Sequence, residues 1–317
     1  MRYFLAGGTL TVLIFVGFLF SLPSRTLVYS ADFGGAEGDF DVSSYIFKKS
    51  DKSLPLSAEA YLVTDLESNE TVVSKNDKRI LPIASITKLI TALVAQELLK
   101  SDQIVTISPT AYDTYGNTGR LRVGEKLRVK DLFYPLLLSS SNDAAEALAE
   151  ATGREKFLAE MNNRAKKIGL TDTFFADPSG LSPINISTAA DLAKLADYLY
   201  HYRPDILAIT REKKYRLGRH VWTNLNNISL MPNYLGGKNG YTEEANRTLV
   251  SIFQVPIESS STASTTVTEK KSRLLALVLL QSNDRQKDTR GLLNYLTNFT
   301  SYLGGKNGFV PITPSLN

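Results

Sequence analysis

The order of strand-like and helix-like segments is the feature that most limits the fold of this chain. Residues 59–65 and 70–74 are typical of a strand pair that turns at Ser68-Asn69. A long helical block follows, and two apolar strands at residues 247–253 and 273–280 come only after it. Strands and helices grouped in blocks favour an α/β fold with an antiparallel sheet and flanking helices over a doubly wound parallel sheet.

Helical periodicity marks the middle of the chain and its end. The helix expected from Thr188 has Asp191 at the spacing of a capping box. Residues 104–129 look β-rich and variable, and the Ser/Thr-rich residues 258–271 look like a mobile hairpin insertion. The predicted helices are residues 84–99, 143–152, 154–168, 188–202 and 288–299.

The N-terminal segment is apolar and predicts export. Residues 4–22 carry no charge, Arg2 precedes them, and an acidic Gly-rich stretch begins at Asp32. This length suits a membrane span of about 20 residues, and the flanking charges place the N-terminus in the cytoplasm and the rest outside. Cleavage after Ser30 as a signal peptide is the open alternative.

Four parts of the chain follow from these patterns. The first is an anchor or signal peptide, and a polar linker separates it from the folded catalytic domain. The chain ends in a short tail. The seven residues Tyr-Leu-Gly-Gly-Lys-Asn-Gly of 234–240 recur at 302–308, where the tail begins, and we expect this second copy to be non-catalytic. The expected bounds are 1–30, 31–54, 55–303 and 304–317.

Composition excludes several kinds of chemistry. The chain has 317 residues, 43% of them hydrophobic, which is enough for a sizeable core. The net charge of +4 comes without a basic block interleaved with aromatic residues, so we expect no nucleic-acid partner. With no cysteine, and with His201 and His220 as the two histidines, we expect no disulfide, no thiolate nucleophile, no metal site and no cofactor.

Ser85-x-x-Lys88 is the first motif that carries chemistry. Positions i and i+3 of a helix share a face, so the hydroxyl and the amine are neighbours. A serine is a weak nucleophile, and a lysine in a partly dry site can lose its charge and take the serine's proton. The pair is therefore a candidate Ser/Lys dyad.

Two further motifs follow, the first about 55 residues after Ser85 and the second about 100 residues after that. Ser140-x-Asn142 stands at the start of an expected helix, and Lys238-Asn239-Gly240 enters a strand. This order resembles the three boxes of penicillin-recognising serine enzymes. Residues 56–300 are similar to the D-alanyl-D-alanine carboxypeptidases, the low-molecular-mass penicillin-binding proteins, and the segment 173–181 contributes to that likeness.

The resemblance implies a fold and an activity. The fold is β-lactamase/transpeptidase-like, an antiparallel sheet flanked by helices with an inserted helical subdomain. The activity is a serine-type D-alanyl-D-alanine carboxypeptidase that acts on peptidoglycan stem peptides outside the cytoplasm, with β-lactams as covalent inhibitors. A D,D-endopeptidase of the same fold and a weakly catalytic penicillin-binding scaffold are the alternatives.

The resemblance also implies roles for the residues. Ser85 attacks the carbonyl between the two D-alanines, and Lys88 is the base. Ser140 relays a proton to the leaving amine, while Asn142 holds Lys88 and the substrate amide. Lys238 supplies a fixed positive charge that favours neutral Lys88 and attracts the substrate carboxylate.

The remaining expected site residues bind the oxyanion and the substrate carboxylate. The backbone N–H groups of Ser85 and Tyr241 would form the oxyanion hole. Arg285 falls where the family carries an arginine near the carboxylate, with a solvated surface position as the alternative. The usual third box is Lys-Thr-Gly, so Asn239 before Gly240 departs from it, and we expect altered rather than abolished activity.

Other conspicuous residues have structural interpretations. We expect His201 to close a helix and His220 to lie beside a strand. Trp222 fits the core or the groove. Asp143 and Glu146 are expected to stabilise the dipole at a helix N-terminus.

Overall fold

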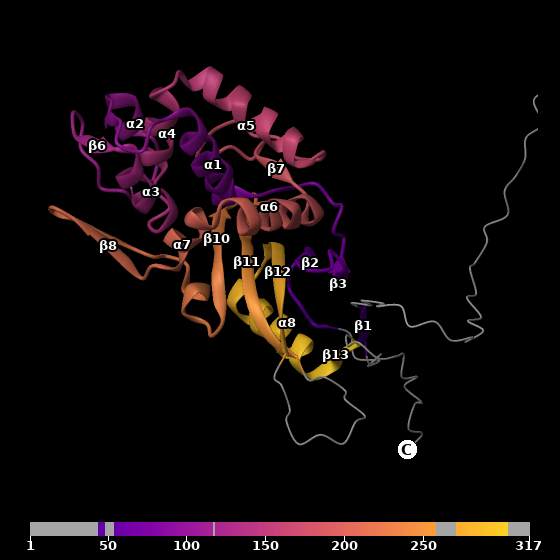
Figure 1. Cartoon of the computed structure of the whole chain (residues 1–317). Coiled ribbons are helices and arrows are strands. Elements are labelled where there is room, and N and C mark those ends of the chain that lie inside the picture. Colours follow the sequence, from indigo (N-terminus) through magenta and orange to yellow (C-terminus); the bar gives the residue numbers. More distant parts are fainter. Residues whose placement is uncertain (1–43, 48–53, 117, 258–270, 304–317) are drawn as a thin grey trace, which may run out of the picture. The chain divides into compact units, whose positions relative to one another are not determined.

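The computed structural model describes residues 44–47, 54–116, 118–257 and 271–303. At its centre is a five-stranded antiparallel sheet in the order β10-β11-β12-β2-β3 (Figure 1). The N-terminal strands thus join the C-terminal strands across the helical block, which confirms the expected antiparallel α/β fold. The strands are β2 Ala60–Asp65, β3 Thr71–Lys75, β10 Tyr234–Thr242, β11 Asn246–Ile257 and β12 Lys271–Ser282.

Each face of the sheet packs into its own hydrophobic core. Strand residues alternate between the two, so Leu62 belongs to the larger core and Val63 to the smaller one. Helices α1 (Lys88–Leu98) and α6 (Ala189–Tyr202) contribute to the larger core, and α8 (Arg285–Phe299) contributes to the smaller one. The result is a sheet with helices on both faces.

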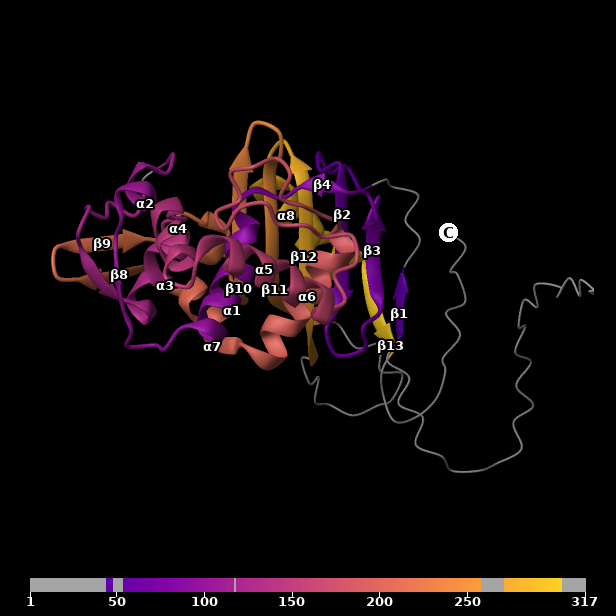
Figure 2. The same cartoon turned by 90° about the horizontal axis from the view of Figure 1, so that it is seen from above.

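A mainly helical part lies beside the β10 edge of the sheet, and a hairpin extends from it (Figure 2). The described chain has further helices and short strand pairs. The helices are α2 Pro109–Asp113, α3 Val129–Leu137, α4 Asn142–Glu150, α5 Arg154–Ile168 and α7 Pro204–Arg211, with the 3₁₀ turns η1 Ala84–Thr87 and η2 Asn227–Leu230. The short pairs are β4 Leu81–Pro82 with β7 Ile186–Ser187, β5 Ile104–Thr106 with β6 Lys126–Arg128, and β8 Lys214–Leu217 with β9 His220–Thr223.

The longer predicted helices are confirmed because they carry their own start and stop signals. α5 has the predicted bounds and ends at Gly169, which adopts the left-handed conformation. Thr188 caps α6, and its hydroxyl accepts from the Asp191 N–H at 3.0 Å. Ser141 caps α4 in the same way through the Ala144 N–H.

Shorter elements differ from the prediction. The stretch expected to be β-rich contains α2, whose cap Ser108 accepts from the Ala111 N–H and whose first residue is Pro109. α8 begins at Arg285, three residues before the predicted start, because Asp284 caps it. Asp288, the predicted start, is buried and accepts from Ser282 Oγ at 2.6 Å.

The ends of the described chain meet in a two-stranded sheet. β1 (Ser44–Phe47) pairs antiparallel with β13 (Thr300–Leu303), so a strand lies within the range expected to be linker. The predicted anchor, the insertion at 258–270 and the repeat at 304–308 lie outside the described residues. Within the described residues, no helix combines the length and the hydropathy that a membrane span requires.

Candidate active site

The Ser85-x-x-Lys88 motif spans the junction of η1 and α1. We expected one helix through both residues, but Ser85 lies in the 3₁₀ turn and Lys88 is the first residue of the α-helix. In a 3₁₀ turn the side chains at i and i+3 eclipse each other. The Lys88 Nζ atom accordingly lies 2.9 Å from the Ser85 Oγ atom, as the dyad requires.

The backbone that leads into Ser85 is held in an unusual conformation. Ala84 has a φ of 50°, in the left-handed region that costs a non-glycine residue about 1–2 kcal/mol. The Thr248 hydroxyl of β11 donates to the Ile83 carbonyl at 2.9 Å. Gly180 packs on the other side, where a Cβ atom would stand 2.1 Å from the Ala84 oxygen. Two distant segments therefore fix the position of the nucleophile.

Three oxygen atoms surround the amine of Lys88. Its Nζ atom lies 2.6 Å from Asn142 Oδ1 and also contacts the backbone oxygen of Ser179, in addition to Ser85 Oγ. The Asn142 oxygen and the Ser179 carbonyl can only accept hydrogen bonds. They therefore take two N–H groups of the amine, and the third direction faces Ser85.

This arrangement suits a lysine that works as a base. A neutral amine has two N–H donors and one lone pair, and the two obligatory acceptors use both donors. The lone pair then points to Ser85 Oγ, whose hydroxyl can donate to it. Burial lowers the pKa of Lys88 to about 7, although the Asp177 and Asp143 carboxylates act in the opposite direction.

The turn that carries Ser179 is a functional element that sequence reasoning noted only as part of a family likeness. The half-buried Asp177 carboxylate accepts from the N–H groups of Ser179, Gly180 and Ser182 and from the Ser179 hydroxyl, each at 2.7 Å. Burial would raise the pKa of Asp177, but these hydrogen bonds outweigh it and lower the pKa below its usual value. The turn is thereby fixed, and the Ser179 carbonyl stays on Lys88. The Asp-Pro-Ser-Gly sequence is the signal from which a tight turn could have been predicted.

The second box lies between α3 and α4. Asn142 holds Lys88 as expected, but an Nδ2 N–H donates to the Tyr115 carbonyl at 2.7 Å, which leaves one amide N–H for a substrate. Ser140 is half-buried and has a φ of 56°. Among the described residues, its hydroxyl makes no hydrogen bond to Ser85 or Lys88.

The third box lies on β10, the edge strand of the sheet, directly beside the nucleophile. A Cβ atom on Gly240 would stand 2.8 Å from the Ser85 backbone nitrogen. The Gly237 N–H points away from β11, because it donates to the Thr210 hydroxyl of α7 at 3.0 Å. N–H groups alternate along a strand, so the Tyr241 N–H points to the same free edge. The two expected oxyanion donors thus come from neighbouring segments.

Lys238 differs from the fixed charge that we expected. Its side chain is buried, and burial, followed by the charges of Lys88 and Arg285, lowers the pKa of Lys238 well below its usual value. Its Nζ atom donates to the backbone oxygen of Asn239 at 2.7 Å and to the side-chain oxygen of Asn239 at 3.3 Å, both uncharged. A positive charge on Lys238 therefore costs free energy until an anion binds nearby.

Arg285 lies at the same end of the sheet. Its Nη1 atom donates to the Gly240 carbonyl at 3.0 Å, and the side chain is partly buried. Burial and the charge of Arg247 lower the pKa of Arg285. The structure thus brings Arg285 to the third box and contradicts the alternative of a fully solvated arginine.

The acidic residues after the second box divide into two kinds. Asp143 lies in the first turn of α4, as expected. Glu146 lies beyond the first turn, is buried and forms an ion pair with Arg154, so its expected role at the helix dipole is wrong. Burial raises the pKa of Glu146, and the hydrogen bond and charge of Arg154 offset part of that effect.

The other conspicuous residues are structural. His201 closes α6 and contacts Asp197. His220 belongs to β9 rather than lying beside it, and its Nε2 atom is 2.7 Å from Glu125. Trp222 is buried in the core, where its Nε1–H donates to the Gly119 carbonyl at 2.8 Å.

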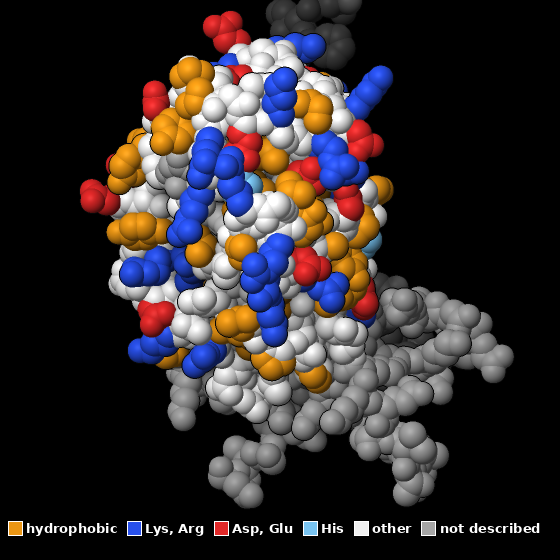
Figure 3. All heavy atoms as spheres, turned by 90° about the vertical axis from the view of Figure 1, so that its left-hand side faces the viewer, with side chains coloured by type: hydrophobic (Ala, Val, Ile, Leu, Met, Phe, Trp, Pro, Cys, Tyr) orange, Lys and Arg blue, Asp and Glu red, His pale blue; other side chains and the backbone are white. Residues whose placement is uncertain are grey.

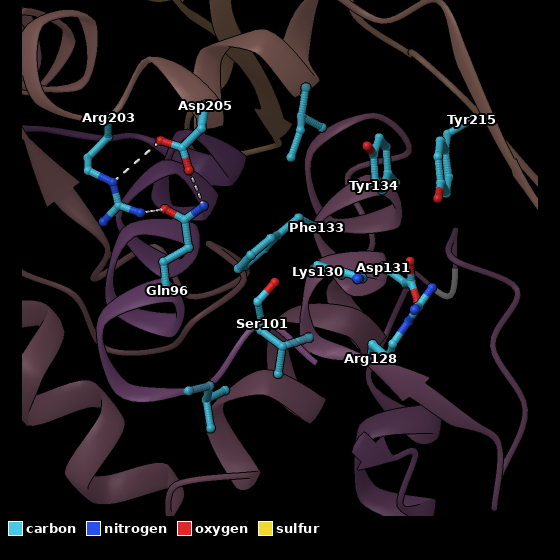
Figure 4. A pocket seen from close by; sticks show the side chains of 13 residues that line it. Gln96, Ser101, Arg128, Lys130, Asp131, Phe133, Tyr134, Arg203, Asp205 and Tyr215 are labelled. Carbon is cyan, nitrogen blue, oxygen red and sulfur yellow. Dashed lines mark hydrogen bonds and ion pairs between the residues drawn. The ribbon is translucent and has the colours of Figure 1, made fainter. Parts of the chain in front are cut away.

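A separate cavity of about 550 Å³ lies at the far end of α1 (Figure 4). Its lining includes Gln96, Arg203 and Asp205, which bond one another, as the dashed lines show. Neither Ser85 nor Lys88 lines it, so it is distinct from the dyad. Among the described residues, no group of three His, Asp or Glu side chains is placed to hold a metal ion.

Several known proteins are similar to this chain in sequence. A D-alanyl-D-alanine endopeptidase from Pseudomonas aeruginosa is 35% identical over 219 residues, which cover 62% of this chain and 68% of that protein. The D-alanyl-D-alanine carboxypeptidase DacC from Escherichia coli is 33% identical over 244 residues, which cover 72% of this chain and 58% of that protein. The chain thus spans about three fifths to two thirds of the length of these relatives.

Solved structures share the fold. Penicillin-binding protein D2 from Listeria monocytogenes, in its cefotaxime-bound form, matches with a TM-score of 0.64 and 28% identity over 77% of this chain and 98% of that one. The profile of the family described as D-alanyl-D-alanine carboxypeptidase matches residues 47–260, which include all three boxes. This chain therefore belongs to the D-alanyl-D-alanine carboxypeptidase family of serine peptidases.

Proposed function

We propose that the protein is a serine-type D-alanyl-D-alanine carboxypeptidase that removes the terminal D-alanine of peptidoglycan stem peptides. The observation that carries the proposal is the Lys88 amine, which is buried, has a pKa of about 7, and lies 2.9 Å from Ser85 Oγ. A neutral lysine in that place activates the serine without a histidine. The names of the relatives and the family profile support the substrate class.

The reaction has two halves. Lys88 Nζ takes the Ser85 Oγ proton, and Oγ attacks the carbonyl carbon between the two D-alanines. When the tetrahedral intermediate collapses, the C–N bond breaks, the amine receives the proton through Ser140, and D-alanine leaves. Water then adds to the Ser85 ester with Lys88 as base, and the shortened peptide departs.

The third box binds the two negative charges that the reaction presents. The N–H groups of Ser85 and Tyr241 stabilise the oxyanion. The substrate carboxylate binds beside Lys238, with Asn239 and Arg285 near it. Because the anion offsets the cost of a buried charge, it favours protonated Lys238, and that charge in turn favours neutral Lys88.

A D,D-endopeptidase activity is the second candidate. Relatives from Pseudomonas aeruginosa and Escherichia coli, each 35% identical over the matched region, are named D-alanyl-D-alanine endopeptidases. The bond cleaved is of the same kind, but the leaving amine belongs to a neighbouring stem peptide rather than to free D-alanine.

The proposed place of action is the outer side of the cytoplasmic membrane. The uncharged segment 4–22 and the flanking charges support an N-terminal anchor. Fractionation of cells with an antibody against the catalytic domain tests this. Recovery of the full-length chain with membranes supports the anchor, and recovery in the medium of a chain that begins near Ala31 contradicts it.

Labelling by a fluorescent penicillin followed by substrate assays tests the function. The wild-type protein should be labelled covalently and should release D-alanine from a pentapeptide. Ser85→Ala should abolish both, whereas Ser74→Ala, which changes an exposed serine on β3, should change neither. Cleavage of cross-linked dimers without D-alanine release would replace the carboxypeptidase by the endopeptidase. Undiminished labelling of Ser85→Ala would overturn the assignment of Ser85 as the nucleophile.

A further inference from the structure

The β8–β9 hairpin has two chemically different faces. Strand residues alternate, so Tyr215 and Trp222 face the body of the protein, while Lys214 and Arg216 of β8 face solvent. This alternation continues on β9, where Val221 is exposed. The hairpin therefore has a basic outer face and an apolar, aromatic inner face.

The inner face anchors the hairpin. The rings of Tyr215 and Tyr134 are stacked with centroids 3.5 Å apart, and Figure 4 shows them face to face. Trp222 continues this stack and donates to the Gly119 carbonyl, while His220 contacts Glu125 at 2.7 Å. A surface held at several points loses little entropy when it binds a partner.

The outer face carries cations without counter-ions. Arg211, Lys213, Lys214 and Arg216 are all exposed. None of the four lies within 4.0 Å of an acidic oxygen among the described residues, whereas Arg219 at the turn lies 3.5 Å from Glu125. In Figure 3, which looks at the side where β6 and β8 lie, Lys and Arg side chains spread over much of the face. Glu212 is exposed in the same run, so four cations and one carboxylate leave this segment with an excess of positive charge.

The hairpin that carries this basic face is hydrogen-bonded to the segment before the second box. β9 ends at Thr223, whose carbonyl accepts from the Ser139 hydroxyl at 3.4 Å. Two residues further, the Leu225 N–H donates to the Leu138 carbonyl at 2.9 Å. Since Ser139 precedes the second box, the hairpin is a rigid extension of the segment that carries Ser140.

We propose that the outer face of β8–β9, Lys213, Lys214 and Arg216 with Arg211 beside them, binds the carboxylate-bearing peptidoglycan polymer next to the stem peptide being cleaved. This inference rests on the proposed function. Every stem peptide that awaits a carboxypeptidase ends in a free carboxylate, so a polymer with many stems is a polyanion. A basic face on a hairpin that is hydrogen-bonded to the segment before the second box attracts that polymer and raises its rate of association.

The double variant Lys214→Glu/Arg216→Glu tests the proposal. Its matched control is Lys156→Glu/Lys166→Glu, which reverses two exposed lysines on α5. At low salt, the hairpin variant should lose about 10-fold in kcat/KM for insoluble peptidoglycan, because steering by charge changes association by about 10- to 1,000-fold. The loss should shrink strongly in about 1 M NaCl, where the screening length is about 3 Å. Penicillin acylation and cleavage of a soluble pentapeptide should stay unchanged.

Several results would overturn the proposal. An equal loss in the α5 variant would show a general charge effect, and a loss on the soluble pentapeptide would show damage to the cleft. A loss that disappears after phosphate polymers are stripped from the peptidoglycan would assign the face to those polymers. Preferential binding to anionic lipid vesicles over peptidoglycan would assign it to membranes.

Co-sedimentation of the Ser85→Ala protein with peptidoglycan tests the binding face independently of the proposed carboxypeptidase activity. If the wild type failed to release D-alanine, the proposed function would fail. Salt-sensitive co-sedimentation that the hairpin variant loses would still support the binding face, and co-sedimentation that the variant retains would overturn it.

Discussion

Gly240 of β10 lies so close to Ser85 that a Cβ atom on it would stand 2.8 Å from the Ser85 backbone nitrogen. Real Cβ atoms essentially never make contacts that short, and the neighbour here is backbone. The same Cβ atom would stand 2.6 Å from the Thr248 hydroxyl oxygen, which helps to fix the segment before Ser85. The glycine therefore permits the close approach of the edge strand to the nucleophile that the proposed oxyanion hole requires.

Gly240→Ala should slow acylation by a β-lactam about 100- to 1,000-fold, the usual effect of removing an oxyanion donor, because the strand or Ser85 must shift. Gly291→Ala is the control, since its Cβ atom would meet the flexible end of Leu56 at 3.1 Å and should be tolerated. Stopped-flow acylation measures the rate, and circular dichroism checks the fold. Wild-type acylation by Gly240→Ala would contradict the proposed contact.

The parts of the site that lie in side chains could be predicted from the sequence. The contacts among Ser85, Lys88 and Asn142 were predictable because the spacing and order of the three boxes identify the family. The antiparallel sheet was predictable because apolar strands lie on both sides of a helical block in the sequence. Long helices such as residues 154–168 were predicted because their pattern and caps are local.

The backbone carbonyl groups that support the site could not be predicted. The Ser179 and Tyr115 carbonyls hold the Lys88–Asn142 pair. Every residue has a backbone carbonyl, so the residue type does not indicate which carbonyl makes such a contact. The lowered pKa of Lys238 depends on its burial and on its proximity to Lys88 and Arg285, which only the tertiary structure gives. The short α7 and the β8–β9 hairpin have too few residues for a periodic pattern.

Lys88→Met should abolish acylation and change how stability depends on pH. In the native protein the pKa of Lys88 is about 7, compared with 10.5 for an exposed lysine. Between these values the unfolded chain binds more protons, so the wild-type free energy of unfolding rises with pH. The variant lacks this contribution. The melting temperature of the wild type should therefore rise relative to that of Lys88→Met between pH 7 and 10, and a constant difference would contradict a lowered pKa.

Asn142→Asp should move the pH dependence of catalysis. The new carboxylate would stand where Asn142 Oδ1 lies, 2.6 Å from Lys88 Nζ, and an adjacent negative charge raises the pKa of an amine. The base must be neutral, so the rising limb of kcat/KM, at about pH 7 in the wild type, should shift to higher pH in the variant. Pentapeptide cleavage from pH 5 to 10 measures the shift. An unmoved limb would mean that another group is the base.

Asp177→Asn should destabilise the turn that supports Lys88. The carboxylate accepts N–H groups from Ser179, Gly180 and Ser182, and charged hydrogen bonds contribute about 1.5–3 kcal/mol each. Because the folded pKa of Asp177 is lowered, its contribution is present at neutral pH and is lost as the pH falls through that value. In urea unfolding at pH 7, the variant should have a lower free energy of unfolding than the wild type, and this difference should become smaller in acid. Asp172→Asn, an exposed aspartate near the same loop, should have little effect.

Asn239→Thr tests what the unusual third box does. The Asn239 side-chain oxygen accepts from Lys238 at 3.3 Å, while the backbone oxygen of the same residue accepts at 2.7 Å and would remain. Threonine is smaller and brings a hydroxyl that donates to a carboxylate. We expect Asn239→Thr to raise kcat/KM for release of a terminal D-alanine, whose free carboxylate it can bond, more than for cleavage of cross-linked dimers. The change should be about 10- to 100-fold, the size of one hydrogen bond to a charged group. Asn239→Ala, which has neither group, should lower both activities, and equal effects of the two substitutions on both substrates would show that Asn239 does not contact the carboxylate.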